Sequence, residues 1–478
     1  MINTYAGKPG GGTCGKGGKT MGLGKRAAAL LCAAWIAVCC TGCDSLILGD
    51  TDALMRPPRP TGDKAGIHEL LEQTAGANFT FKYPAGGDNR SAIIMQDLTG
   101  DGTQEAIALY EKEETSSTGV NIMFIHKQDG VWTSMGSFAS AATQVDRVLF
   151  GDVNGDFLQE AVVGWGSGQS GVSSVSVFSL TQGEDGSPRM AETKLEQSYS
   201  RLLVMDFDGD GADEIFTAAV TMGEQPAQAR LLRMRGGAIE LLGSCAIDSA
   251  VTSLTSASGG LLGPEQPGVL LDGAKATNTF VTEVVYWDQK RGTLVSPFLN
   301  RETQTVETTQ RSLNITSRDI NGDKILEIPM VNLLPGTPTQ NASDTAYLTD
   351  WHQYDAETNT LVRVMSTVTN STDGYWFLIP DMWKDQITTE QDVSDRSLCF
   401  KRWIAPEENR AEGSSGVTLL EICVFTADQW SKEQETDGYF QILTNNNLIY
   451  AGRIPFPDNS LAMSENDVRN SFKLITQE

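Results

Sequence analysis

The chain has 478 residues, of which 40% are apolar, so it is long enough for two or three domains with buried cores. Its 61 acidic residues outnumber the 36 Lys and Arg residues, and the formal net charge is −25. That charge argues against nucleic acid or anionic lipid surfaces as the binding partner, and it favours solubility and cation binding.

The first 43 residues have the pattern of a targeting signal. Lys25 and Arg26 precede an apolar stretch, 27–38, that is too short to span a bilayer. The stretch ends in Cys-Thr-Gly-Cys at 40–43, which resembles a bacterial lipobox. This resemblance implies cleavage before Cys43, lipid attachment to its thiol, and a protein anchored in the cell membrane on the extracellular face. Residues 44–65 are rich in Asp, Pro and Gly and are predicted to form a flexible spacer.

Residues 66–372 are predicted to be mainly β. In one stretch, four segments have strand patterns, namely 145–150, 161–165, 172–178 and 190–195. Four short antiparallel strands are the content of one blade of a β-propeller. Residues 66–90 are expected to supply a strand that helps to close the ring, because a propeller must cover its terminal edges.

An acidic turn recurs between the predicted strands. Its first, third, fifth and ninth places hold Asp, Asn, Thr or Glu, and glycine recurs between them. The turns start at Asp97, Asp152, Asp206 and Asp319, which are 55, 54 and 113 residues apart. The last gap is close to two periods, and a worn repeat without carboxylates is expected near Gly260. Five repeats are therefore visible, which indicates a repeat architecture.

Oxygen ligands at alternate positions of a tight turn are what a hard cation such as Ca²⁺ requires. Asp, Asn and Gly also form good turns without metal, but four such turns in phase are poorly explained that way. An EF-hand loop would need a carboxylate at the twelfth place and flanking helices. The twelfth places instead hold Ala108, Val163, Thr217 and Met330, and apolar strand patterns follow.

The turns resemble the Ca²⁺-binding loops of FG-GAP or VCBS repeats in integrin-like β-propellers. This resemblance implies a mainly β fold with five visible blades, six or seven if degenerate blades are counted. It also implies that the ligands of the bound Ca²⁺ are these side chains: Asp97, Thr99, Asp101, Glu105, Asp152, Asn154, Asp156, Glu160, Asp206, Asp208, Asp210, Glu214, Asp319, Asn321, Asp323 and Glu327.

The four loops are not equivalent. The loop at Asp206 is expected to be the best site, whereas Thr99 weakens the first loop because a neutral hydroxyl replaces a charged or amide ligand. Phe157 and Lys324 replace glycine at the sixth place, where the loop must turn sharply. The expected role of Ca²⁺ is to cancel clustered charge and stiffen each turn.

Residues 373–478 are predicted to form a small α+β domain. Ser464 followed by Asp467 is a capping signal that predicts a final helix. The first part of this region, up to Trp403, has a second interpretation as a sixth, degenerate blade. Of the cysteines beyond the leader, Cys399 and Cys423 are expected to be buried free thiols, with a disulfide between them as the alternative.

No catalytic motif is found, and the three histidines, His68, His126 and His352, stand in unrelated contexts. The chain is therefore interpreted as a binding module for a protein or glycan ligand and not as an enzyme. Its layout resembles uncharacterised VCBS-repeat lipoproteins of Gram-positive bacteria. Two alternatives stay open: an extracellular enzyme that acts on polysaccharide with the propeller as scaffold, and an envelope assembly factor.

Overall fold

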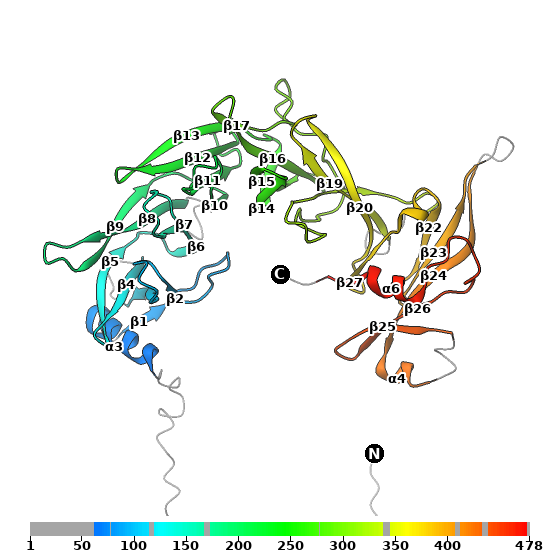
Figure 1. Cartoon of the computed structure of the whole chain (residues 1–478), viewed down its shortest axis with the longest axis horizontal. Coiled ribbons are helices and arrows are strands. Elements are labelled where there is room, and N and C mark those ends of the chain that lie inside the picture. Colours follow the sequence, from blue (N-terminus) through cyan, green and yellow to red (C-terminus); the bar gives the residue numbers. More distant parts are fainter. Residues whose placement is uncertain are drawn as a thin grey trace, which may run out of the picture. The chain divides into compact units, whose positions relative to one another are not determined.

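The structure is a computed structural model that describes residues 62–475 except 77, 114–118, 167–172, 277, 338–344, 407–411 and 433–437. The predicted signal, Cys43 and most of the spacer lie outside the described residues. The fold is mainly β, with several antiparallel sheets that follow one another along the chain (Figure 1). No helix within the described ranges is long and apolar enough to cross a membrane.

The described part begins with helix α3, Asp63–Ala75, where strands were predicted. Its buried residues Ile67, Leu71 and Ala75 are four apart, which places them on one helix face. This face packs against Ala106 and Trp132 of the first sheet. The sequence interpretation missed this stripe because it sought only alternating patterns.

The first sheet has the strand order β1-β3-β4-β5, with β2 also paired to β3. Its strands are β1 Phe79–Phe81, β2 Ile93–Gln96, β3 Glu105–Lys112, β4 Val120–Gln128 and β5 Val131–Ala139. The expectation that residues 66–90 close a ring is therefore wrong for β1, which pairs inside the first sheet. Helix α3 covers one face of this sheet, and no strand of the sixth sheet pairs with it among the described residues.

The next three sheets each contain four strands in chain order, as predicted for one repeat. The second sheet is β6 Gln144–Gly151, β7 Glu160–Gly166, β8 Ser173–Gln182 and β9 Pro188–Leu195. The third sheet is β10 Arg201–Met205, β11 Glu214–Ala219, β12 Gln228–Arg235 and β13 Ala238–Ala246. The fourth sheet is β14 Val251–Gly263, β15 Gln266–Lys275, β16 Thr279–Asp288 and β17 Thr293–Val295.

The fifth and sixth sheets share the C-terminal part of the chain. The fifth sheet is β18 Ile328–Asn332, β19 Tyr347–Asp355, β20 Thr360–Asn370, β21 Tyr375–Leu378 and β27 Phe472–Leu474. The sixth sheet is β22 Ile387–Asp392, β23 Ser397–Ile404, β24 Ser414–Thr426, β26 Leu448–Arg453 and β25 Phe440–Asn445, in that order. Among the described residues of this region, the short helices are η3 Asp381–Trp383, α4 Ala427–Trp430 and α6 Glu465–Ser471.

These pairings bear on the C-terminal predictions. The expected boundary between 372 and 373 falls between β20 and β21, which are hydrogen-bonded neighbours in one sheet. Helix α6 begins where predicted, because the Ser464 hydroxyl accepts a hydrogen bond from the backbone N–H of Asp467. Cys245, Cys399 and Cys423 are free thiols, as expected, but the expected burial holds only for Cys423, because Cys245 and Cys399 are partly exposed.

A hydrophobic cluster lies between each pair of consecutive sheets. Phe124 of the first sheet packs on Phe178 of the second, with ring centroids 4.9 Å apart, and Phe207 next to the third sheet belongs to the cluster shared with the fourth. The fifth and sixth sheets share a larger cluster around Trp383, which is fully buried. Burial of apolar surface between sheets is therefore what orders the repeats, since each sheet alone has little to bury.

Candidate metal sites

All four acidic loops occupy the same position relative to a pair of strands. The first three join the first and second strands of a repeat, β2 to β3, β6 to β7 and β10 to β11. In each loop the residue before the first-place Asp pairs with the ninth-place Glu, and the pairs are Gln96 with Glu105, Gly151 with Glu160, Met205 with Glu214 and Arg318 with Glu327. The loops are therefore one structural unit used four times.

The first-place aspartate shapes each loop from inside. Its two carboxylate oxygens accept hydrogen bonds from the backbone N–H groups of the fourth and sixth places. For Asp206 these donors are Gly209 at 2.7 Å and Gly211 at 3.1 Å, and the other three loops repeat the pattern. The fifth-place aspartate of each loop adds a bond from the backbone N–H of the seventh place, so short-range hydrogen bonds within the loop hold its bends.

The sixth place adopts a left-handed backbone in every loop, as the sequence predicted. Gly211 has φ of 92°, whereas Phe157 and Lys324 have φ of 67° and 72°. A residue with a Cβ costs about 1–2 kcal/mol in this conformation. Two loops therefore carry local strain that the loop at Asp206 avoids.

The ninth-place glutamates are buried, with 0–2% of each residue exposed. In every loop one carboxylate oxygen accepts the backbone N–H of the second place, at 2.8–3.0 Å. Burial, followed by the nearby aspartates, raises the pKa of Glu160 and of Glu214 to about 8. Burial also raises the pKa of Glu105 and Glu327. A cation next to these carboxylates would offset the cost of burying their charge.

The structure brings carboxylate oxygens together in two of the loops. Oxygens of Asp206, Asp208 and Asp210 lie within 4.8 Å of one another, and so do those of Asp319, Asp323 and Glu327. No ion pair joins a loop carboxylate to Lys or Arg in the described part of the chain. Every donor is oxygen, without nitrogen or sulfur, which fits Ca²⁺ or another hard cation.

Side-chain amides distinguish the second and fourth loops from the third. The Asn154 amide donates to both Asp156 and Glu160, at 3.0 and 2.8 Å. The Asn321 amide donates to Asp323 and Glu327 in the same way, and Gln353 adds further bonds to both carboxylates. These amide donors already give the carboxylate oxygens of the second and fourth loops some of their hydrogen bonds. The loop at Asp206 has an aspartate at the third place instead of an amide, which adds a negative charge to the loop.

Neighbouring loops are also linked to each other. The Asp213 carboxylate accepts the backbone N–H of Asp152 at 3.0 Å, and the Asp213 N–H donates to the Asp152 carbonyl at 2.7 Å. A Cβ on Gly100 would lie 2.7 Å from Leu158 Cδ2, so the second loop rests directly on the first. A role for Asp213 was not predicted from the sequence. The available signal was an extra carboxylate at the eighth place of the loop, directly before the ninth-place Glu214.

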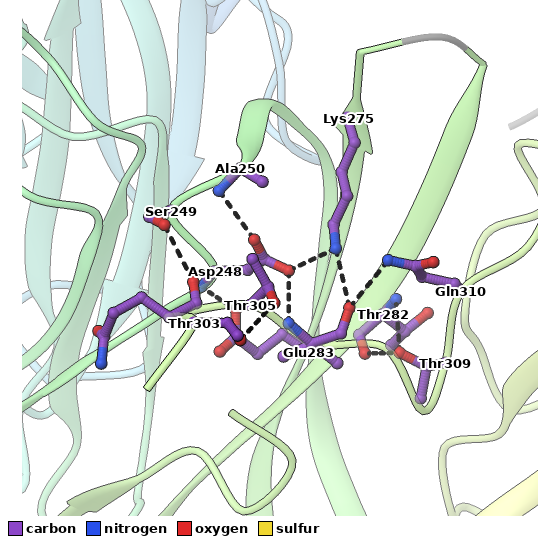
Figure 2. A network of polar contacts seen from close by, with 12 residues as sticks. Asp248, Ser249, Ala250, Lys275, Thr282, Glu283, Thr303, Thr305, Thr309 and Gln310 are labelled. Carbon is purple, nitrogen blue, oxygen red and sulfur yellow. Dashed lines mark hydrogen bonds and ion pairs between the residues drawn. The ribbon is translucent and has the colours of Figure 1, made fainter. Parts of the chain in front are cut away.

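The fourth sheet has no acidic loop, as expected for the worn repeat. A tight turn at 264–265 joins β14 to β15. This sheet instead buries charges that neutralise each other (Figure 2): Lys275 Nζ lies 2.7 Å from Asp248 Oδ2, and Glu283 accepts the Asp248 backbone N–H at 2.9 Å. A second buried pair joins Arg311 and Asp272 at 2.8 Å.

The three histidines lie on separate elements, and His126 lines one cavity together with Asp101 and Glu105 of the first loop. His68 is on α3, 3.4 Å from Glu72, His126 is on β4 and His352 is on β19. Burial is the main cause that lowers the pKa of His126 and His352.

Comparisons with known proteins leave the family open. No family model matches the chain, and no curated protein matches it. Among solved structures, Sqt1 of Chaetomium thermophilum aligns with a TM-score of 0.32 and 8% identity, covering 78% of this chain and 88% of that one. The rhamnogalacturonan lyase PL11 of Bacillus licheniformis aligns with a TM-score of 0.29 and 14% identity, covering 72% and 73%. Both TM-scores are too low to inform fold or function.

Proposed function

We propose that this chain is a cell-surface lipoprotein in which Ca²⁺ braces a series of propeller-type blades, and that these blades act as a binding module for a protein or glycan. The observation that carries the proposal is the fourfold repetition of one loop geometry at equivalent strand pairs. A turn that only reverses the chain needs no buried glutamate and no converging carboxylates.

Within each loop the proposed division of labour follows from the contacts. The first-place aspartate fixes the backbone, the third- and fifth-place side chains supply exposed oxygens, and the ninth-place glutamate supplies a buried one. When bound, Ca²⁺ would neutralise these oxygens and stabilise the folded state by mass action. The succession of four-stranded sheets supports the blade interpretation, and closure into a ring belongs to the proposal.

Calorimetric titration of the full chain with CaCl₂ tests the metal part. We expect saturable binding with the tightest site at Asp206, and Asp208→Asn should remove that tightest phase. Asp185→Asn is the matched control, because Asp185 lies in an exposed turn of its own and its carboxylate accepts bonds from Ser187. Absence of any saturable heat, or an unchanged tight phase in Asp208→Asn, would contradict the proposal.

Lipid labelling in a Gram-positive host tests the anchor. A palmitate analogue should label the wild-type chain and leave Cys43→Ala unlabelled and released from the membrane fraction. Cys32→Ala, which lies in the apolar stretch before the lipobox, controls for a general effect of changing a cysteine in the signal. Label that persists in Cys43→Ala would overturn the anchor. Cleavage of any member of a polysaccharide panel would overturn the binding-module interpretation in favour of an enzyme.

A further inference from the structure

A cavity of about 800 Å³ lies where the fourth and fifth sheets meet. Its lining includes Tyr286 of β16, the turn that follows β16, the segment 295–304 and Tyr354 of β19. The volume falls in the range of small-molecule sites, which is about 300–1,000 Å³. The acidic loops do not line this cavity, and the two are joined through Gln289 of the turn after β16, which donates to the Asp208 carbonyl.

The charge of this cavity is opposite to that of the chain. Its charged lining residues are three cations, Lys290, Arg291 and Arg301, and one acid, Asp288. The whole sequence has 61 acidic residues against 36 Lys and Arg. A second cavity of about 750 Å³, next to β20 and η3, shows no such reversal, since its charged lining residues are Asp350, Arg363, Asp381, Lys384 and Asp385. Local positive charge in so acidic a chain focuses the field at this cavity and attracts anions.

The cations of this cavity are available to a ligand. Arg291 Nε lies 3.3 Å from Asp288 Oδ2, but 65% of the Arg291 side chain is exposed. Lys290 and Arg301 have no ion pair with a carboxylate in the described part of the chain. The Asp288 carboxylate is occupied with the turn itself, because it accepts the backbone N–H groups of Lys290 and Arg291. Two cations without an ion pair and a partly paired third thus line the cavity.

The rest of the lining suits a sugar ring better than a bare anion. Tyr286 is half-buried, and its ring centroid lies 5.8 Å from that of the buried Tyr354. The Tyr354 hydroxyl donates to Asn359 Oδ1 at 3.1 Å, which orients an amide in the cavity wall. An aromatic ring offers an apolar surface with a polar edge, which a sugar ring would use and a bare anion would not, whereas the Asn359 amide can bond to either.

We propose that this cationic cavity binds an acidic saccharide. The sugar carboxylate pairs with Arg301 and Lys290, and the sugar ring lies against Tyr286. A planar guanidinium meets a carboxylate with two parallel hydrogen bonds, so Arg301 carries most of the selectivity for charge. The inference rests on the proposed binding function, for which it names the ligand class.

Calorimetry with the full chain in CaCl₂ tests the cavity. The probes are tetramers of glucuronate, galacturonate and mannuronate, each paired with its carboxyl-reduced neutral counterpart. At least one acidic tetramer should bind, and its neutral counterpart should bind at least about tenfold more weakly, equivalent to about 1.4 kcal/mol. Higher salt should weaken the acidic tetramer, because exposed charges are screened.

Two charge reversals assign that binding to the cavity. Arg301→Glu should weaken the acidic tetramer at least about tenfold, whereas Arg235→Glu should bind like the wild type. Arg235 is an exposed residue at the end of β12, so the variant changes net charge equally but outside the cavity. The melting temperature and the Ca²⁺ titration of Arg301→Glu should match those of the wild type, which excludes misfolding as the cause.

Several results would overturn the inference: no binding of any acidic tetramer, equal binding of a neutral counterpart, or undiminished binding by Arg301→Glu. Inorganic phosphate that binds as tightly as the tetramer would also overturn the saccharide assignment, because the cavity would then be a simple anion site. If the chain binds Ca²⁺ normally but binds no tetramer, only the proposal that the cavity binds an acidic saccharide is rejected. Loss of Ca²⁺ binding in the wild type rejects the proposed function itself.

Discussion

The third and fourth sheets both contain buried carboxylates, and they differ in the groups that lie near those charges. In the third sheet, the loop at Asp206 brings the carboxylates of Asp206, Asp208 and Asp210 together. Glu214 is buried there, and no basic side chain forms an ion pair with it among the residues that the structure describes. The fourth sheet has a tight turn in place of that loop, and it buries Asp248 against Lys275 (Figure 2). It also buries Asp272 against Arg311. The chain supplies its own cations in the fourth sheet, whereas we propose that the third sheet takes a cation from solution. Calcium should therefore matter to one sheet and not to the other.

The largest expected effect is the loss of a buried cation from the fourth sheet. Arg311→Met leaves Asp272 buried without its partner, and it should lower the free energy of unfolding by about 3–5 kcal/mol. Urea denaturation should give the same loss in CaCl₂ and in EDTA, because no metal loop is involved. Arg189→Met removes an exposed pair with Asp185 at 3.9 Å, and this control should cost less than about 1 kcal/mol. If Ca²⁺ restored the stability that Arg311→Met loses, the fourth sheet would depend on calcium as well, which would contradict the proposed difference between the two sheets.

The second-largest expected effect is a change of the free energy of unfolding with pH, which is caused by the titration of Glu283. Burial, partly offset by hydrogen bonds to its carboxylate, raises the pKa of Glu283 to about 7 in the folded state. A raised carboxyl pKa stabilises the fold fully below the ordinary value of about 4.5, and that stabilisation is lost as pH rises through about 7. The change amounts to at most about 3 kcal/mol.

Urea denaturation from pH 4.5 to 8 should show this trend as a difference between variants. The wild type should lose stability relative to Glu283→Gln as pH rises through this window. Glu302→Gln changes an exposed glutamate of the same region and should run parallel to the wild type. Parallel curves for Glu283→Gln and the wild type would show that Glu283 titrates normally.

In the third sheet, a change to one of the proposed metal ligands should lower the free energy of unfolding only when Ca²⁺ is present. At a Ca²⁺ concentration of about 100 times the dissociation constant, one occupied site adds about 2.7 kcal/mol to the free energy of unfolding. Asp208→Asn should lose that increment in CaCl₂ and match the wild type in EDTA. Thermal or urea unfolding in both buffers measures the difference. An equal loss in EDTA would mean that Asp208 acts only through the fold.

The smallest effect should come from the link between the second and third sheets. Asp213→Ala removes the acceptor of the Asp152 backbone N–H and should cost about 0.5–1.5 kcal/mol. Asp213→Asn keeps an acceptor oxygen and should recover most of that loss. Urea denaturation of the pair compares them directly, and equal losses would show that the hydrogen bond itself contributes nothing.

The parts of the molecule that follow local rules were predictable from sequence. The loop at Asp206, the strain at Phe157 and the capping of the final helix by Ser464 each depend on residues a few places apart. The four strands of the second sheet followed from alternating patterns and turn residues in the same way. Local periodicity therefore sufficed for the repeat and for the geometry of its loops.

The remaining features depend on tertiary contacts, which carry little local signal. Arg311 and Asp272 are 39 residues apart in sequence, and neither position looks like a buried ion pair. The final strand β27 joins the fifth sheet across nearly a hundred residues from β21, so the predicted domain boundary did not anticipate it. The cationic cavity likewise gathers Tyr286, Arg301 and Asn359 from separate segments.

The most direct test of the account is the melting temperature of the full chain in excess CaCl₂, in EDTA, and in EDTA followed by CaCl₂. We predict that EDTA lowers the midpoint by several degrees, that Ca²⁺ restores it, and that Asp208→Asn reduces the difference. A midpoint that is the same in all three buffers would contradict the claim that the acidic loops are calcium sites.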